Sequence, residues 1–233
     1  MPHRPPIPLW PLALLAGALP ALAALVAWGL SIRLALVPEC NPFIDGCVSI
    51  SRAARHGLPN HVFRAILLPA AGLQAVVWVL AARWLHGARG ARWLLPMGIA
   101  AAIALALYGS FLGTEGAAYR FLRHWGTVGY FGLTCLNMLI VGNAIVRQAT
   151  QPNWLRHGLH ALLGLLVLLG LVNAAFSPLL EPAGQDRIEN VTEWWGALVM
   201  TLLFFALALI WRREAVSVEL RSGGPDADSR SMS

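Results

Sequence analysis

The sequence predicts an all-α membrane protein, a bundle of six transmembrane helices with a long first outer loop. Of its 233 residues, 58% are hydrophobic and 12% are charged, whereas soluble domains average about 45–50% and about 25%. The apolar residues also gather into six runs, each long enough to cross the hydrocarbon core as a helix. The predicted spans lie near 9–36, 63–85, 93–113, 124–146, 157–179 and 191–211.

The connections between these runs are too short for a sizeable soluble domain. We expect one membrane domain over residues 1–213 and a tail over 214–233 that is rich in Ser, Gly and Asp, a composition typical of disorder. The first run is longer than the hydrophobic core of a signal peptide, which has about 7–15 residues, so it is interpreted as a retained span.

The net charge of +6 comes from 17 basic residues, all of them Arg, scattered in ones and twos beside the apolar runs. No basic stripe forms, so a nucleic-acid partner is not expected. The absence of Lys, together with abundant Ala, Leu and Gly, indicates a GC-rich bacterial genome. The predicted location is therefore a bacterial inner membrane.

The distribution of charge between the loops predicts that both termini are cytoplasmic. This orientation puts a mild excess of Arg on the cytoplasmic side, as the positive-inside rule requires. Most acidic residues then lie outside, although acids carry little topological weight. These outer acids are Glu39, Asp45, Glu115, Glu181, Asp186, Glu189 and Glu193.

Two of the three cysteines, Cys40 and Cys47, lie in the first loop. In an oxidising outer compartment they are expected to form a disulfide. The alternative is a pair of buried free thiols. A zinc site is less favoured, because its ligands are usually more closely spaced and more numerous. Cys135, inside the fourth span, is expected to pack as a small hydrophobic residue.

The histidines predict no metal and no cofactor. His157 and His160 stand three residues apart and could touch one metal ion, but the adjacent Trp154 and Arg156 favour an interfacial anchor. His124 begins a span at the opposite face of the membrane. It therefore cannot share a haem with either of them.

Two residues at outer helix starts are the candidate catalytic pair. A helical wheel places His124 on one stripe with Arg120, Thr127 and Thr134. Ionisable groups within spans are costly and tend to line functional cavities, so His124 is a candidate general base. Glu193 is its candidate partner. The alternative for Glu193 is a capping box with Asn190, and for His124 a structural role against a neighbouring helix.

The candidate binding residues surround this pair. Ser49 and Ser51 open a short amphipathic helix in the first loop, which is expected to end at Gly57 and lie along the membrane surface; capping is the favoured role of either serine. Asn60 is expected to cap the second span. Positively charged side chains in this region can hold a phosphate, and Glu115 can face the same cavity. The basic candidates are Arg64 and Arg120.

Three of these segments resemble the damage-regulated autophagy modulator family, which includes the protein that remodels GPI-anchor lipids after attachment. They are Ser49-Ile50-Ser51 followed by Gly57-Leu58-Pro59-Asn60 and Phe63-Arg64, the stretch from His124 to Phe131, and Glu193-Trp194. The resemblance covers residues 40–210. It implies six spans, inward termini and work at the outer face, with roles for His124, Glu193, Ser49, Ser51 and Arg64. Arg52 stands where many members carry an acid, so a Ser–Asp pair is missing here.

Together these features predict a lipid-handling protein with an outer-leaflet polar cavity, either a lysolipid acyltransferase or a lipase-like enzyme. Its partner would be a membrane lipid. The alternative is a non-enzymatic lipid-binding or regulatory scaffold, in which the same groups only neutralise one another. A transporter is less favoured, because no internal repeat or broken helix is visible.

Overall fold

A computed structural model describes residues 6–148 and 151–219 and confirms the all-α six-span bundle. Within these residues, six helices are long and apolar enough to cross a membrane. They are α1 (Trp10–Arg33), α3 (Gly57–Trp84), α4 (Leu94–Phe111), α5 (Ala117–Gln148), α6 (Asn153–Phe176) and α7 (Pro182–Arg213). The shorter elements are α2 (Ile50–Ala53), two 3-10 turns (Ala91–Trp93 and Ser177–Leu179), β1 (Ile7–Pro8) and β2 (Ser217–Val218).

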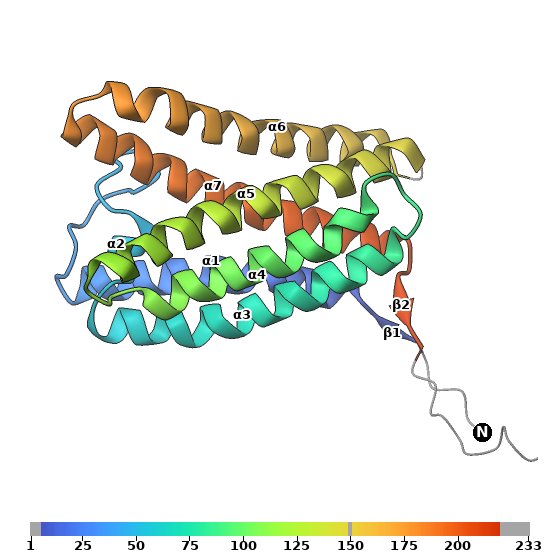
Figure 1. Cartoon of the computed structure of the whole chain (residues 1–233), viewed down its shortest axis with the longest axis horizontal. Helices are drawn as coiled ribbons and strands as arrows, with labels where there is room; N and C mark the ends of the chain where they lie inside the picture. The colour runs from blue at the N-terminus through green and yellow to red at the C-terminus, as the bar shows by residue number, and fades with distance from the viewer. Residues whose placement is uncertain (1–5, 149–150, 220–233) are drawn as a thin grey trace, which may run out of the picture.

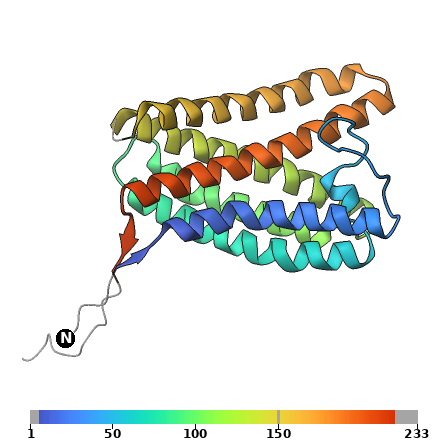
Figure 2. The same ribbon diagram turned by 180° about the vertical axis from the view of Figure 1, so that it is seen from behind.

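The long helices run side by side along one axis (Figures 1 and 2). Around the bundle the neighbours follow in the order α6, α7, α1, α3, α4 and α5. β1 and β2 lie at one end, which we call the terminal end, and α2 with the first long loop lies at the other, which we call the disulfide end (Figure 1).

Three helices begin six to nine residues earlier than the apolar runs predicted. α3 starts at Gly57, α5 at Ala117 and α7 at Pro182, against predicted starts at 63, 124 and 191. The added turns are polar, so a search for apolar runs does not include them. Their backbones nevertheless continue the same helices. All three extensions lie at the disulfide end and lengthen the bundle beyond its apolar core.

The start of the predicted disordered tail is ordered. Ser217 and Val218 pair in antiparallel fashion with Pro8 and Ile7, and the Leu9 N–H donates to the Val216 carbonyl at 3.0 Å. The prediction of disorder is therefore wrong for the residues that follow α7. Its remainder, 220–233, lies outside the described residues.

The core of the bundle is centred on large aromatic side chains. Trp78 of α3 is fully buried and stacks at an angle on Phe204 of α7, with 5.7 Å between ring centroids. Gly98 of α4 leaves room for Trp78, because a Cβ at that position would overlap the tryptophan. Close approach of α3 and α4 at the level of Trp78 thus depends on this small residue.

α6 is the peripheral helix. Its buried side chains, Leu155, Leu159, Leu163 and Leu166, all lie in the half near the terminal end. Beyond Leu166 the helix stays close to α7 but presents large apolar side chains such as Leu168 and Leu171 to the surroundings. At the disulfide end, α5 and α7 are consequently not separated by a packed α6.

Gly98→Ala should lower the thermal midpoint of the detergent-solubilised protein by several degrees. The new methyl group overlaps Trp78, and overpacking of a core costs about 1–3 kcal/mol. Gly72→Ala is the matched control, because a Cβ at Gly72 meets no atom and Ala favours the helix. An unchanged midpoint for Gly98→Ala would contradict this account of the α3–α4 contact.

An apolar cavity with Glu193 at one end

The first loop is closed by the predicted disulfide between Cys40 and Cys47. Side chains of α7 fasten this loop to the bundle by donating hydrogen bonds to its backbone carbonyls. Asn190 Nδ2 donates to the Gly46 oxygen at 2.7 Å, and Trp194 Nε1 donates to the Val48 oxygen at 2.9 Å. The loop is therefore a lid fixed on α7.

The short helix α2 lies under this lid. Ser49 is its N-cap, with Oγ accepting from the Arg52 N–H at 3.0 Å, which confirms capping as the role of this serine. Ser51 lies two residues on, with its hydroxyl 3.1 Å from that of Ser49. The expected amphipathic surface helix is wrong in length and place: it ends at Ala53, and Ile50 and Ala53 are buried in the bundle.

Asn60 joins three elements instead of capping a helix. α3 has already begun at Gly57, so the predicted cap is wrong. The buried Asn60 amide donates to the Ala54 carbonyl at 2.9 Å and to the Leu112 carbonyl at 3.0 Å. It thereby satisfies backbone oxygens at the ends of α2 and α4, as a low-dielectric interior requires.

Glu193 is not part of a capping box. Both Asn190 and Glu193 lie well inside α7, which starts at Pro182, and the Asn190 amide is used by the loop. Glu193 is partly buried, and the backbone N–H groups of Ile50 and Ser51 approach its carboxylate. The acid therefore faces inward, under the start of α2.

Glu193 lines an internal cavity of about 60 Å³ between all the spanning helices except α6. Most of the wall is apolar, with Phe63, Leu67, Leu105 and Phe204 among its residues. The polar side chains on the wall are those of Gln74, Tyr108, Thr127, Tyr130, Glu193 and Thr201. This volume is large enough for a few water molecules or a narrow hydrocarbon group.

The cavity is elongated along the bundle. On α7 its wall extends from Glu193 to Phe204, and on α3 from Phe63 to Gln74. Eleven residues of helix correspond to about 16 Å at 1.5 Å per residue. Glu193 marks the end of the cavity nearer the loop, and Phe204 marks its deep end.

Two arginines add positive charge near the Glu193 end. Arg55, in the turn after α2, interacts electrostatically with Glu193 and with Tyr108. Arg123 of α5 donates from Nη1 to the Phe111 carbonyl at 3.2 Å and also interacts electrostatically with Tyr108. The hydroxyl of Tyr108 is buried without a hydrogen-bond partner among the described residues. Neither these arginines nor Tyr108 were identified as candidates from the sequence.

A second polar group lies deeper, on α3 and α5. Gln74, which is 1% exposed, donates from Nε2 to the Ala16 carbonyl at 2.9 Å and to the Tyr130 hydroxyl at 3.1 Å. The Ala16 oxygen needs this donor because Pro20, four residues on, has no N–H to complete the helical hydrogen bond. A Pro in the first span and a Gln in the second were the only sequence signals for this link.

The structure does not bring His124 together with Glu193. His124 is exposed, its ring packs edge-on against Trp125 with 5.7 Å between centroids, and it is not a cavity-lining residue. Of the predicted stripe, Thr127 lines the cavity and Thr134 is fully buried, while Arg120 is exposed. The first two residues of the stripe, Arg120 and His124, therefore face the surroundings, and the later two, Thr127 and Thr134, face the interior of the bundle.

The remaining candidates lie around the rim of the disulfide end. Arg64 is partly exposed near the start of α3, and Glu115 is exposed in the α4–α5 connection. The side chains of these two residues and of Arg120 form no hydrogen bond or ion pair with another described residue. None of the three lines the cavity, so a phosphate held by these arginines would lie at the rim.

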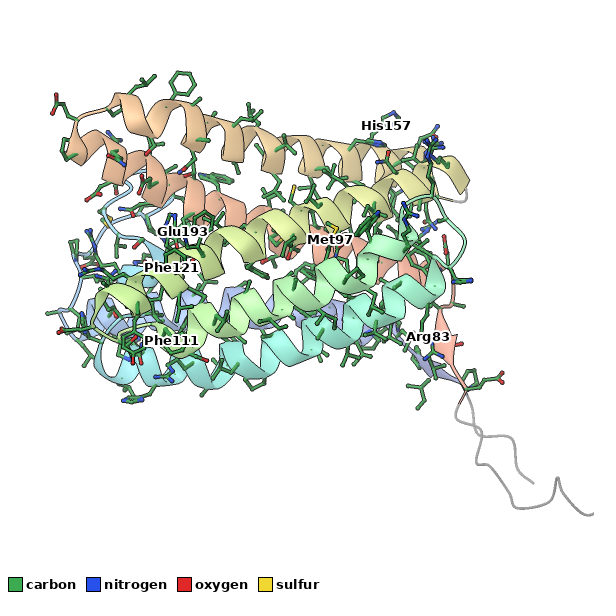
Figure 3. All side chains as sticks on the ribbon, in the orientation of Figure 1. Arg83, Met97, Phe111, Phe121, His157 and Glu193 are labelled. Carbon is green, nitrogen blue, oxygen red and sulfur yellow. A yellow bond between two sulfur atoms is a disulfide. The ribbon has the colours of Figure 1, made fainter. Side chains whose placement is uncertain are left out.

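His157 lies at the far end of the molecule from Glu193 (Figure 3). His160, one turn on, has Nδ1 2.7 Å from the Arg156 carbonyl oxygen. Within residues 6–148 and 151–219, no group of three or more His, Cys, Asp or Glu side chains is arranged to hold a metal ion.

Comparison of the chain with protein-family models, with curated proteins and with solved structures finds no match. Function is therefore inferred from the geometry of the cavity.

Replacing both Cys40 and Cys47 by Ser should speed amide hydrogen exchange in the first loop more than in the six long helices. The ring closed by the disulfide is short, so its loss frees little chain entropy, and the bonds from Asn190 and Trp194 remain. Hydrogen-exchange mass spectrometry in detergent measures this. Equal acceleration in the helices would show that the bridge supports the whole bundle.

Proposed function

We propose that this protein is an integral membrane lipid-handling protein that takes the hydrocarbon chain of a lipid into its cavity, with the lipid's polar end beside Glu193. The observation that carries the proposal is the shape and chemistry of the cavity. It is narrow, runs about 16 Å along the bundle, is apolar over most of its wall and has a carboxylate at one end.

An intramembrane acid is costly and is commonly retained for function. Glu193 offers hydrogen-bond acceptors to a polar head or linker group, while Arg55 and Tyr108 place positive charge and a hydroxyl nearby. A lipid combines a chain for the apolar wall with polar groups for this end. A water-soluble substrate would leave most of the wall without a matching surface.

Access from the membrane is favoured by the arrangement of α5, α6 and α7. The disulfide-end half of α6 has no buried residue between Val167 and Phe176, so it does not cover the space between α5 and α7 tightly. Phe131 of α5 closes this space by reaching Gly196 of α7. A bound chain has to widen the cavity, and rotation of Phe131 and the flexible Met200 provides a means.

Lipid binding is favoured over catalysis as the basic activity. Acyl transfer by the predicted pair needs the imidazole of His124 beside the Glu193 carboxylate, so that one orients the other. The exposed position of His124, against Trp125, does not provide this arrangement. Lipid remodelling remains the enzymatic form of the proposal, and it requires a lipid in the same cavity.

Glu193→Gln should weaken the binding of oleoyl lysophosphatidylcholine at least tenfold and leave the thermal midpoint within a few degrees. The amide keeps the size of the side chain but removes its charge, which alters the interaction with the lipid's polar end more than the packing. Native mass spectrometry of the gently extracted protein measures bound lipid, and circular dichroism gives the midpoint. Glu181→Gln, exposed at the start of α7, is the control.

Retained binding with a large fall in the midpoint would contradict the proposal. Glu193 would then serve only to neutralise Arg55, which is the scaffold alternative. His124→Ala separates the two lipid-handling forms, because binding should persist in that variant whether or not turnover depends on the imidazole.

We also propose that both termini are cytoplasmic and the disulfide loop is on the outer side of a bacterial inner membrane. The bridge favours an oxidising compartment for the loop. In a Cys135→Ala background, a membrane-impermeant maleimide on intact cells should label Glu115→Cys and spare Arg89→Cys. Glu115 and Arg89 are both exposed, at opposite ends of the bundle. The reverse labelling would invert the topology.

A further inference from the structure

Gln74 and Tyr130 leave an unused hydrogen-bonding site in the deep part of the cavity. Both protons of the Gln74 amide are engaged, one by the Ala16 carbonyl and one by the Tyr130 hydroxyl. Because a carbonyl oxygen can bond only to a donor, the contact with Ala16 fixes which end of the amide points there. The other atom, Oε1, is buried and has no hydrogen-bond partner among the described residues.

A structural role accounts for only half of this side chain. Donation to Ala16 compensates the N–H that Pro20 lacks, so Nε2 is explained by the backbone of α1. It does not explain why an acceptor is left without a donor in an apolar interior, which costs about 1–3 kcal/mol. An ordinary core would place Oε1 against a donor.

The Tyr130 hydroxyl supplies the complementary half. It accepts from Gln74, so its own proton is free to be donated. Both side chains line the cavity. The pair therefore places one unused acceptor and one unused donor at the cavity wall.

This combination matches a hydroxyl group, which donates to Oε1 and accepts from Tyr130. A carboxylate or phosphate would leave Gln74 Oε1 without a donor and bring charge next to an uncharged acceptor. The nearest cavity walls are apolar or neutral, with Thr201 using its hydroxyl proton on the Ala197 carbonyl at 2.9 Å. The site is thus built for a neutral group.

The depth of the pair places that hydroxyl far from the lipid head. Gln74 bonds to Ala16, and the neighbouring Gly17 lies against Thr201 and Phe204 of α7. Glu193 precedes these two residues by eight and eleven positions, so the pair lies about 12–16 Å below the carboxylate along the bundle. A ligand with its polar end at Glu193 reaches Gln74 with the middle of its chain.

We propose that Gln74 and Tyr130 form a subsite for a mid-chain hydroxyl, so that the cavity prefers lipids with a hydroxylated hydrocarbon chain. This inference rests on the proposed lipid-binding function and specifies its ligand class. The hydroxylated lipid should bind about tenfold more tightly than the unhydroxylated one, because it adds a pair of buried hydrogen bonds.

The test compares two lysophosphatidylcholines that differ only in the mid-chain hydroxyl, ricinoleoyl and oleoyl, competing for the full-length protein in native mass spectrometry. Wild type should bind the ricinoleoyl lipid about tenfold more tightly. A lysophosphatidylcholine whose hydroxyl is next to the chain carbonyl should bind no better than the oleoyl lipid, because that hydroxyl lies beside Glu193 and not beside Gln74.

The variants separate recognition from folding. Tyr130→Phe removes the donor and keeps the ring, and it should reduce the ricinoleoyl preference to nearly one. Gln74→Leu is made together with Pro20→Ala, because this second change restores a backbone N–H that can satisfy the Ala16 carbonyl in place of Gln74. The double variant should also lose the preference, whereas Pro20→Ala alone should keep it.

Each alternative result has a defined meaning. Equal binding of the ricinoleoyl and oleoyl lipids to wild type would overturn the subsite and leave lipid binding intact, with water as the partner of Gln74. A preference that survives in both Tyr130→Phe and the double variant would also overturn it. Failure of all the lipids to bind would overturn the proposed function itself, and the subsite with it.

Discussion

Backbone polar groups that are buried away from water need hydrogen-bond partners within the protein, and this constraint organises the disulfide end of the molecule. The last part of the first loop and α2 pack against the bundle, with Gly46, Val48, Ile50 and Ala53 buried, and they have no strand ladder to pair their backbone groups. Side chains of the long helices supply the missing donors: Asn190 and Trp194 to loop carbonyls, Asn60 to the ends of α2 and α4, and Ser31 to the Ala53 carbonyl. The position of the loop over the bundle follows from these bonds.

The same constraint shapes the inside of the cavity. Pro20 removes one helical hydrogen bond from α1, and Gln74 replaces it from α3. This replacement brings the Gln74 carboxamide into an apolar region. Because Nε2 points at the Ala16 carbonyl of α1, Oε1 points away from it. A local defect in α1 thereby becomes a polar feature of the cavity wall.

Glu193 depends on the loop above it. The loop carbonyls are held by its neighbours on α7, and this places the N–H groups of Ile50 and Ser51 near the carboxylate. Arg55, in the turn after α2, adds a positive charge that interacts with the carboxylate. The loop, the short helix and the acid form one unit, and the disulfide closes the loop.

The sequence by itself determined the membrane class, the six spans, the disulfide and the choice of Glu193 as a candidate, because run length, loop position and the cost of an intramembrane acid are local properties. It misjudged Asn60 and left a capping box open for Asn190 and Glu193, since capping patterns are read from helix starts and the polar first turns of α3 and α7 conceal the true starts. Only the tertiary structure decided that His124 faces outward while Tyr108, Gln74 and Tyr130 face the cavity. These orientations depend on the rotation of each helix against its neighbours, which a one-dimensional pattern of polar residues does not specify.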